Sequence, residues 1–155
     1  MSYMFYIIIV LIVLLDQGSK LFIQSTMDLN NSIAVIDGIF SITYIHNTGA
    51  AFSVLEGKTF FLILVQILVI LAIFVYMIWK GSSLHWTFKT SMALIVGGGL
   101  GNLIDRVNNG YVVDFLHFHF WPIFNIADIS VCCGCGLLIL YVFFIEGKLK
   151  DGKQI

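Results

Sequence analysis

Long apolar segments without charge are the feature of this sequence that most restricts its fold. Residues 1–15, 59–79 and 129–145 contain no charged side chain. About 20 apolar residues of helix span the hydrocarbon core of a bilayer, which is ~30 Å thick. Charged residues make up 11% of the chain and hydrophobic residues 59%, whereas soluble domains are about a quarter charged. Most of the folded surface must therefore contact lipid.

We predict a single membrane domain over residues 1–155, mainly α-helical, with four transmembrane helices. The first span lacks the basic n-region of a cleavable signal peptide, so we expect it to remain as a membrane helix. The net charge of −1 and the lack of a long basic segment exclude a nucleic-acid-binding module. The predicted spans cover about residues 3–23, 59–79, 88–107 and 125–145.

Basic residues are more frequent on one side of the predicted bundle. The loop between the second and third spans and the C-terminal tail carry five Lys residues, against three basic residues on the other side. Because loops rich in Lys and Arg stay in the cytoplasm, we expect both termini there. The longer connections, residues 24–58 and 108–124, then face outward.

Both outward connections contain strand patterns. Residues 33–35 and 40–44 flank Asp37-Gly38, a frequent hairpin turn. Apolar and polar side chains alternate over residues 40–44, and residues 111–120 are rich in aromatic and β-branched side chains. We therefore predict a small extracytoplasmic β-sheet on the membrane surface, with its main element at about residues 30–57.

Several ionisable side chains lie at membrane depth, where each costs ~2.5–3.5 kcal/mol on insertion scales. Asp16 and Lys20 are four residues apart on one helix face. We expect this pair to satisfy each other near the headgroups. The third span ends in a polar corner formed by Asn102, Asp105 and Arg106, which serves either as scaffold or as a substrate contact.

Small residues in the third and fourth spans suit close helix packing. Gly97 and Gly101 form a small-x-x-x-small face that lets another helix approach closely. Cys132 and Cys135 form a Cys-x-x-Cys pattern, which a membrane thiol oxidoreductase would use. Because these thiols and Cys133 lie within an apolar span, we expect them to be buried and to serve packing.

Asp114 and Asp128 stand out because no Lys or Arg lies between Arg106 and Lys148. They flank the short outer connection between the third and fourth spans and can meet at the outer membrane boundary. Two carboxylates in a site of low dielectric constant hold one proton between them. In an aspartyl protease one carboxylate removes a proton from water while the carboxylic acid polarises the scissile carbonyl. A helix N-terminus favours charged Asp128, which would leave Asp114 protonated, although the titration belongs to the pair.

Five short motifs resemble those of the bacterial lipoprotein signal peptidases (signal peptidase II), a family of small four-span membrane aspartyl proteases. The motifs occur in the family's order and extend over most of the chain, including every span except the second. They are Asp16-Gln-Gly-Ser-Lys20, Asn47-Thr-Gly-Ala-Ala-Phe52, Gly101-Asn-Leu-Ile-Asp-Arg106, Gly110-Tyr-Val-Val-Asp-Phe115 and Phe124-Asn-Ile-Ala-Asp128.

The resemblance implies that Asp114 and Asp128 are the catalytic residues. The family removes the signal peptide from diacylglyceryl-modified prolipoproteins just before the lipid-bearing Cys, without a metal or a covalent intermediate. The resemblance also implies a protein of the bacterial cytoplasmic membrane. Its active site would lie near the extracytoplasmic face, covered by the outer sheet and loop. Its partners are prolipoprotein substrates and membrane lipid, with no cofactor and no obligate protein partner. The residues implied to bind substrate or support the site are Asp16, Lys20, Asn47, Asn102, Asp105, Arg106 and Asn125.

Two features depart from the family pattern. Only 13 residues separate Asp114 from Asp128, and the family often has a longer loop there. Ile129 stands where a small residue is common. Both departures concern loop geometry and substrate preference rather than the chemistry.

Two other function classes are compatible with the residues taken alone. His117 and His119 point the same way on a strand and, with His46, could hold zinc, although a His-Glu-x-x-His pattern is missing. Intramembrane acids also serve proton- or ion-coupled transporters. The second and fourth spans, however, contain no acid that would continue a path across the membrane.

Overall fold

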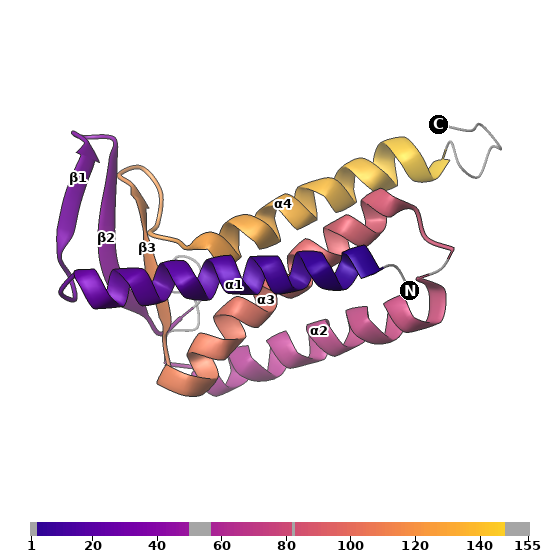
Figure 1. The fold of residues 1–155 in the computed structure, drawn as a ribbon, viewed down its shortest axis with the longest axis horizontal. Coiled ribbons are helices and arrows are strands. Elements are labelled where there is room, and N and C mark those ends of the chain that lie inside the picture. Colours follow the sequence, from indigo (N-terminus) through magenta and orange to yellow (C-terminus); the bar gives the residue numbers. More distant parts are fainter. Residues whose placement is uncertain (1–2, 50–56, 82, 148–155) are drawn as a thin grey trace.

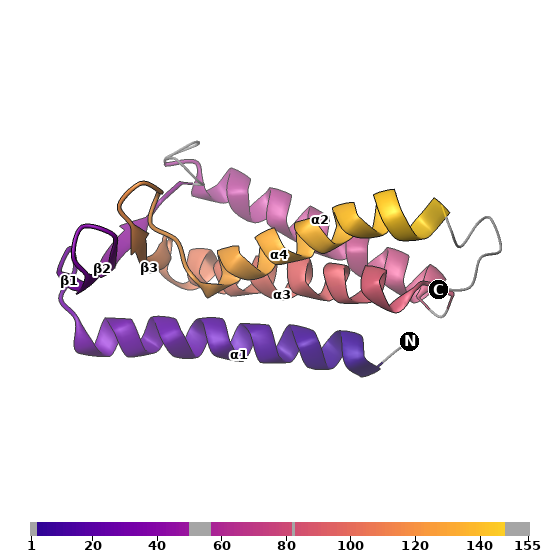
Figure 2. The ribbon, with the colours of Figure 1, turned by 90° about the horizontal axis from the view of Figure 1, so that it is seen from above.

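Four helices lie side by side in the computed structural model, with a small sheet at one end of the bundle (Figures 1 and 2). The structure describes residues 3–49, 57–81 and 83–147. With the π-helical turn that extends the last helix counted in, the helices begin and end within three residues of the predicted spans. They are α1 (Tyr3–Thr26), α2 (Thr59–Lys80), α3 (Trp86–Asn109) and α4 (Ile126–Leu140), which continues into a short π-helix, η2 (Tyr141–Glu146).

The mainly helical membrane fold with a small sheet is confirmed. Among the described residues, three helices are long and apolar enough to cross a bilayer: α1, α2 and α4 with η2. The fourth helix, α3, is as long as α1 but is not among them, because it contains Lys89, Asp105 and Arg106 as well as several glycines. It packs against each of the other three helices, so its polar side chains can face protein rather than lipid.

Large apolar side chains cover the outer faces of the bundle. Leu14 and Phe22 of α1 and Leu68 and Ile78 of α2 are all more than half exposed. Contiguous apolar surfaces of this kind mark contact with a partner or with a membrane. Lipid acyl chains can cover these faces.

Glycines allow α3 to approach its neighbours closely. A Cβ added at Gly97 would lie 2.9 Å from the Cβ of Ile12 in α1, and one at Gly101 would also meet α1. The predicted small-residue face therefore packs against a helix. Gly98, one position along, faces α4 instead, where an added Cβ would meet the backbone of Ala127.

The cysteines of α4 do not pack between helices, and this prediction is wrong. Cys132, Cys133 and Cys135 are free and exposed thiols, so none of them is buried between helices. Gly134 is the residue of this segment that is buried against α3. Because successive helical residues are rotated by about 100°, the residues beside Gly134 turn away from the interface.

Three antiparallel strands form the sheet, in the order β1-β2-β3. The predicted hairpin is confirmed: Asp37-Gly38 connects the first two strands, and Gly38 has a φ of 72° that suits such a turn. The remainder of the predicted β element, residues 50–56, lies outside the described residues. The strands are β1 (Ser32–Ile36), β2 (Phe40–Asn47) and β3 (Val112–Phe118).

Both α3 and α1 help to attach the sheet to the helices. Gly110, with a φ of 80°, ends α3 by donating its N–H to the carbonyl of Arg106, so β3 follows α3 almost directly. Ile23 of α1 packs in one apolar cluster with Val113 and Phe115 of β3. Because side chains alternate along a strand, Asp114, between these two residues, points to the opposite face.

Candidate active site

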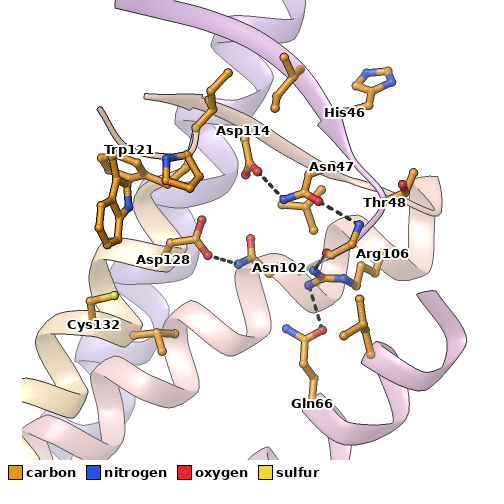
Figure 3. Close-up of a pocket in the computed structure, with 18 residues that line it drawn as sticks. His46, Asn47, Thr48, Gln66, Asn102, Arg106, Asp114, Trp121, Asp128 and Cys132 are labelled. Carbon is orange, nitrogen blue, oxygen red and sulfur yellow. Dashed lines mark hydrogen bonds between the residues drawn. The ribbon is translucent and has the colours of Figure 1, made fainter. Parts of the chain in front are cut away.

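A cleft of about 600 Å³ lies where the sheet meets the helices. Its walls come from β2, β3, α2, α3 and the start of α4 (Figure 3). Polar side chains gather here although the surrounding helices are apolar. Five of the residues predicted for the site line this cleft: Asn47, Asn102, Arg106, Asp114 and Asp128.

Asp114 reaches the cleft from β3 and is only 1% exposed. Its carboxyl group accepts hydrogen bonds from Asn47 Nδ2 at 2.8 Å and from Asn125 Nδ2 at 2.6 Å. Burial, together with the nearby charge of Asp128, raises the pKa of Asp114 from 3.8 to about 7, against the lowering effect of the two amide donors. The protonated form of Asp114 is therefore well populated at neutral pH.

Asp128 is oriented by the start of its own helix. Asn125 is the N-cap of α4: its side-chain oxygen accepts from the backbone N–H of Asp128 at 3.0 Å. In return, Asp128 Oδ2 accepts from the backbone N–H of Asn125 at 3.1 Å, which completes a capping box. The other oxygen, Oδ1, accepts from Asn102 Nδ2 at 2.8 Å. The positive end of the α4 dipole stabilises a negative charge at this position.

Asn125 links the two aspartates. Its Nδ2 donates to Asp114 at 2.6 Å and lies 3.0 Å from Asn102 Oδ1, while its side-chain oxygen caps the helix that carries Asp128. The side chain of Asn125 is fully buried. Any rotation of this amide would disturb the surroundings of both carboxyl groups.

A buried charge cluster lies behind the cleft. Lys20 Nζ is 2.8 Å from Asp16 and 3.0 Å from Asp105, and it donates to Asn102 Oδ1 at 2.9 Å. Lys20 is 2% exposed and Asp16 is fully buried. The predicted pairing of Asp16 with Lys20 is therefore confirmed, and α3 adds a second acid, Asp105, that the sequence did not indicate as a partner of Lys20.

The two acids of this cluster hold the backbone beside each cleft aspartate. Asp16 Oδ1 accepts from the N–H of Ala127, the residue before Asp128, at 2.9 Å. Asp105 Oδ2 accepts from the N–H of Val113, the residue before Asp114, at 3.0 Å. Lys20 joins the two acids. One cation thus connects α1 and α3 to both segments that carry the aspartates.

Arg106 lies across the cleft from Asp128 and fixes the residues that follow β2 (Figure 3). Its Nη2 donates to the carbonyl of Gly49 at 2.7 Å, and its Nη1 donates to Gln66 Oε1 at 3.2 Å. The N–H of Gly49 donates to Asn47 Oδ1 at 2.9 Å, so Arg106 helps to place the amide that contacts Asp114.

Sequence reasoning missed Gln66. The signal was present, because Gln66 is the only amide side chain in α2, an otherwise strongly apolar helix. It missed Gln17 as well, whose Nε2 donates to Asp105 Oδ1 at 2.9 Å. An isolated amide in a membrane helix requires a partner, as an ionisable group does.

The three imidazoles do not meet at one point. The rings of His117 and His119 are 4.8 Å apart, and both contact hydroxyl groups of β2. His46 instead stacks on Tyr111 with ring centroids 3.6 Å apart. Of the residues that the structure describes, no group of three or more His, Cys, Asp or Glu side chains could hold a metal ion. This geometry does not support the zinc alternative.

Comparisons with known proteins point to one family. Residues 8–144 match the family described as signal peptidase (SPase) II. The lipoprotein signal peptidase of Halothermothrix orenii is 44% identical, with 96% of this chain and 100% of that protein covered. That of Bacillus velezensis is 40% identical, with 96% and 99% covered.

Solved structures agree as well. One bacterial membrane enzyme superposes with a TM-score of 0.86 at 34% identity, covering 98% of this chain and 93% of that one. A second superposes with a TM-score of 0.82 at 35% identity, covering 92% and 94%. The chain therefore belongs to the signal peptidase II family.

Proposed function

We propose that this protein is a membrane aspartyl endopeptidase that removes the signal peptide from prolipoproteins, with Asp114 and Asp128 as a water-activating dyad. The observation that carries the proposal is the pair of carboxyl groups facing one cleft, each held by a buried amide, Asn125 for Asp114 and Asn102 for Asp128. Family membership supports the peptidase class and lipoprotein processing. It also favours a peptidase over the transporter alternative.

The dyad divides the chemistry between a base and an acid. The N-terminus of α4 and the Asn102 amide stabilise negative charge on Asp128, so this carboxylate removes a proton from the attacking water. Asp114 holds the shared proton and donates a hydrogen bond to the scissile carbonyl oxygen. When the tetrahedral intermediate collapses, the leaving amine takes a proton from Asp128. The pair then holds one proton again.

Within the prolipoproteins, the proposed substrates carry a diacylglyceryl group on the Cys after the cleavage site. The cleft is bounded by α2, α3 and α4, and Leu62 and Val131 form part of its wall. A lipid-modified substrate already lies in the bilayer, so it can reach this cleft laterally. The Asn, Gln and Arg side chains of the cleft can satisfy the polar groups of the peptide backbone.

We propose that both termini face the cytoplasm and that the sheet and cleft face outward. The start of α1 and the end of η2 lie together at the end of the bundle opposite the sheet (Figure 1). The end of α2 and the start of α3 lie at that same end (Figure 1), and their sequences carry Lys80 and Lys89. This distribution of basic residues supports a cytoplasmic location of that end.

The test uses purified protein with a diacylated prolipoprotein and the same chain without lipid. We expect cleavage of the lipidated substrate only. Asp114→Asn and Asp128→Asn should each lower kcat at least ~10²–10⁴-fold, the usual contribution of a general acid or base. Asp28→Asn, at an exposed acid outside the cleft, is the matched control. Cleavage at the normal rate by either dyad variant would contradict the mechanism.

A further inference from the structure

A second groove, of about 280 Å³, adjoins the active-site cleft on the outer side of α4. Aromatic side chains from the end of β3 and from the segment before α4 form one wall, and the first two turns of α4 form the other. Among the described residues that line the groove, Asp128 has the only charged side chain. The lining residues are Phe118, Phe120, Trp121, Phe124, Asp128, Ile129, Cys132 and Cys133.

This aromatic groove is continuous with the cleft. The two cavities share Trp121, Phe124, Asp128 and Cys132. In the close-up, Trp121 is drawn above Asp128 and Cys132 below it (Figure 3). When the scissile peptide bond of a substrate lies beside Asp128 in the cleft, the side chain of the substrate residue next to that bond can therefore reach the aromatic groove.

We propose that the aromatic groove holds an acyl chain of the diacylglyceryl group on the substrate Cys. This inference rests on the proposed function. In such a substrate the lipid is attached to the residue that directly follows the scissile bond, so its chains must pass close to the dyad. The aromatic groove is the apolar space that contacts Asp128.

The chemistry of the walls favours a hydrocarbon chain over the signal peptide as occupant. A peptide backbone in the aromatic groove would find almost no partner for its N–H and C=O groups, which is costly away from water. The cleft, in contrast, offers amide and guanidinium groups such as those of Asn102, Gln66 and Arg106. The two cavities thus separate the peptide from the lipid of one substrate.

The aromatic groove opens outward, toward the surroundings of the bundle. Phe120 is 80% exposed, Trp121 55% and Ile129 41%. An acyl chain that enters from the bilayer moves from one apolar environment to another, so it gains little hydrophobic free energy. The aromatic groove therefore acts mainly by orienting the lipidated Cys, and its loss should lower kcat more than it raises KM.

Cys133 and Cys135 provide a matched pair for the test. Both are exposed thiols of α4, but Cys133 lines the aromatic groove and Cys135 lines neither cavity. Ile129 and Cys133 are four residues apart and share one face of the helix. A phenyl ring in place of the Cys133 thiol would occupy the space beside Ile129. The same change at Cys135 would leave both cavities unchanged.

The experiment measures cleavage of two synthetic lipopeptides that differ only in their acyl chains, dipalmitoyl and dibutyryl. We expect Cys133→Phe to lower kcat for the dipalmitoyl substrate about tenfold or more, within the range that misplacement of a substrate produces. Cleavage of the dibutyryl substrate should change less than twofold, as should both activities of Cys135→Phe. Equal rates for Cys133→Phe and Cys135→Phe on the dipalmitoyl substrate would overturn the inference.

A second measurement does not depend on how well the variants fold. A dipalmitoyl lipopeptide with a photoreactive diazirine in one acyl chain is bound to the wild-type protein and irradiated. Crosslinks within residues 118–133 support the inference, and crosslinks confined to other helices refute it. A wild-type protein that cleaves neither lipopeptide contradicts the proposed function itself, and with it the role of the aromatic groove.

Discussion

Replacement of Gly98 in α3 by alanine should displace Asp128, which lies on the neighbouring helix α4. A Cβ at Gly98 would meet the carbonyl oxygen of Ala127, would lie 3.2 Å from the carbonyl carbon of that residue, and would lie 2.8 Å from Val131 Cγ2. The backbone of α4 cannot avoid this methyl group by rotating a side chain. The first turn of α4, which carries Asp128, must therefore move away from α3.

The magnitude follows from the contacts. Overpacking of this kind costs about 1–3 kcal/mol, and the better helix propensity of alanine offsets about 0.5–1 kcal/mol of that cost. The net loss of stability is thus at most about 2.5 kcal/mol. A displacement on the order of 1 Å at a catalytic group lowers the rate about 10²-fold. We therefore expect Gly98→Ala to lower kcat by about 10- to 100-fold while the protein stays folded.

Gly99→Ala is the matched control, one residue along the same helix. Its Cβ would lie 3.4 Å from Ile70 Cδ1, at the near limit of ordinary van der Waals contact with the end of a flexible side chain. This variant should retain wild-type kcat and a slightly higher Tm. The assay is cleavage of a diacylated lipopeptide, with thermal unfolding measured in the same detergent. Wild-type kcat in Gly98→Ala, or an equal loss in Gly99→Ala, would refute this explanation of how Asp128 is placed.

Three further predictions concern the polar network. Lys20→Met leaves two buried acids without their cation, so we expect a loss of about 3–5 kcal/mol of stability, seen as a marked fall in Tm; an unchanged Tm would argue against a structural role for the cluster. Gln66→Leu removes the acceptor for Arg106 and should lower kcat/KM about tenfold, whereas Gln66→Glu keeps an acceptor and should restore it. Because the pKa of Asp114 is raised to about 7, its carboxyl group loses its proton above that pH, and kcat should fall there. Asn47→Leu removes an N–H donor that stabilises the carboxylate, so it should shift this alkaline limb of the pH profile to higher pH; a shift to lower pH would contradict the assignment.

Patterns that depend on neighbouring residues were predictable from the sequence. The Asp37-Gly38 turn joins β1 to β2, because a tight hairpin is set by the backbone angles of its own residues. Asn125 and Asp128, three residues apart, form the capping box that starts α4. The helix ends lie close to those predicted because charges and caps interrupt the apolar segments locally.

The orientation of side chains around the membrane helices was not predictable in the same way. Cys132, Cys133 and Cys135 were expected in a helix interface, but they are exposed. In a soluble helix polar residues mark the outward face. In a membrane helix the faces toward lipid and toward protein are both apolar, so composition does not distinguish them. The burial of Ala127, Ser130 and Gly134, and the packing of Gly134 on α3, show which way α4 is turned.

Hydropathy and charge are properties of each segment alone, so the sequence sufficed to predict a helical membrane protein whose intramembrane ionisable groups lie near one end of the bundle. The partners of these groups, in contrast, depend on how the helices pack. Lys20 pairs with Asp105 as well as with its neighbour Asp16, and through them it connects to the backbone beside both cleft aspartates. This arrangement requires α1, α3 and α4 to approach within hydrogen-bond distance of one another. That approach depends on glycines meeting the facing helices, a contact between residues far apart in the chain.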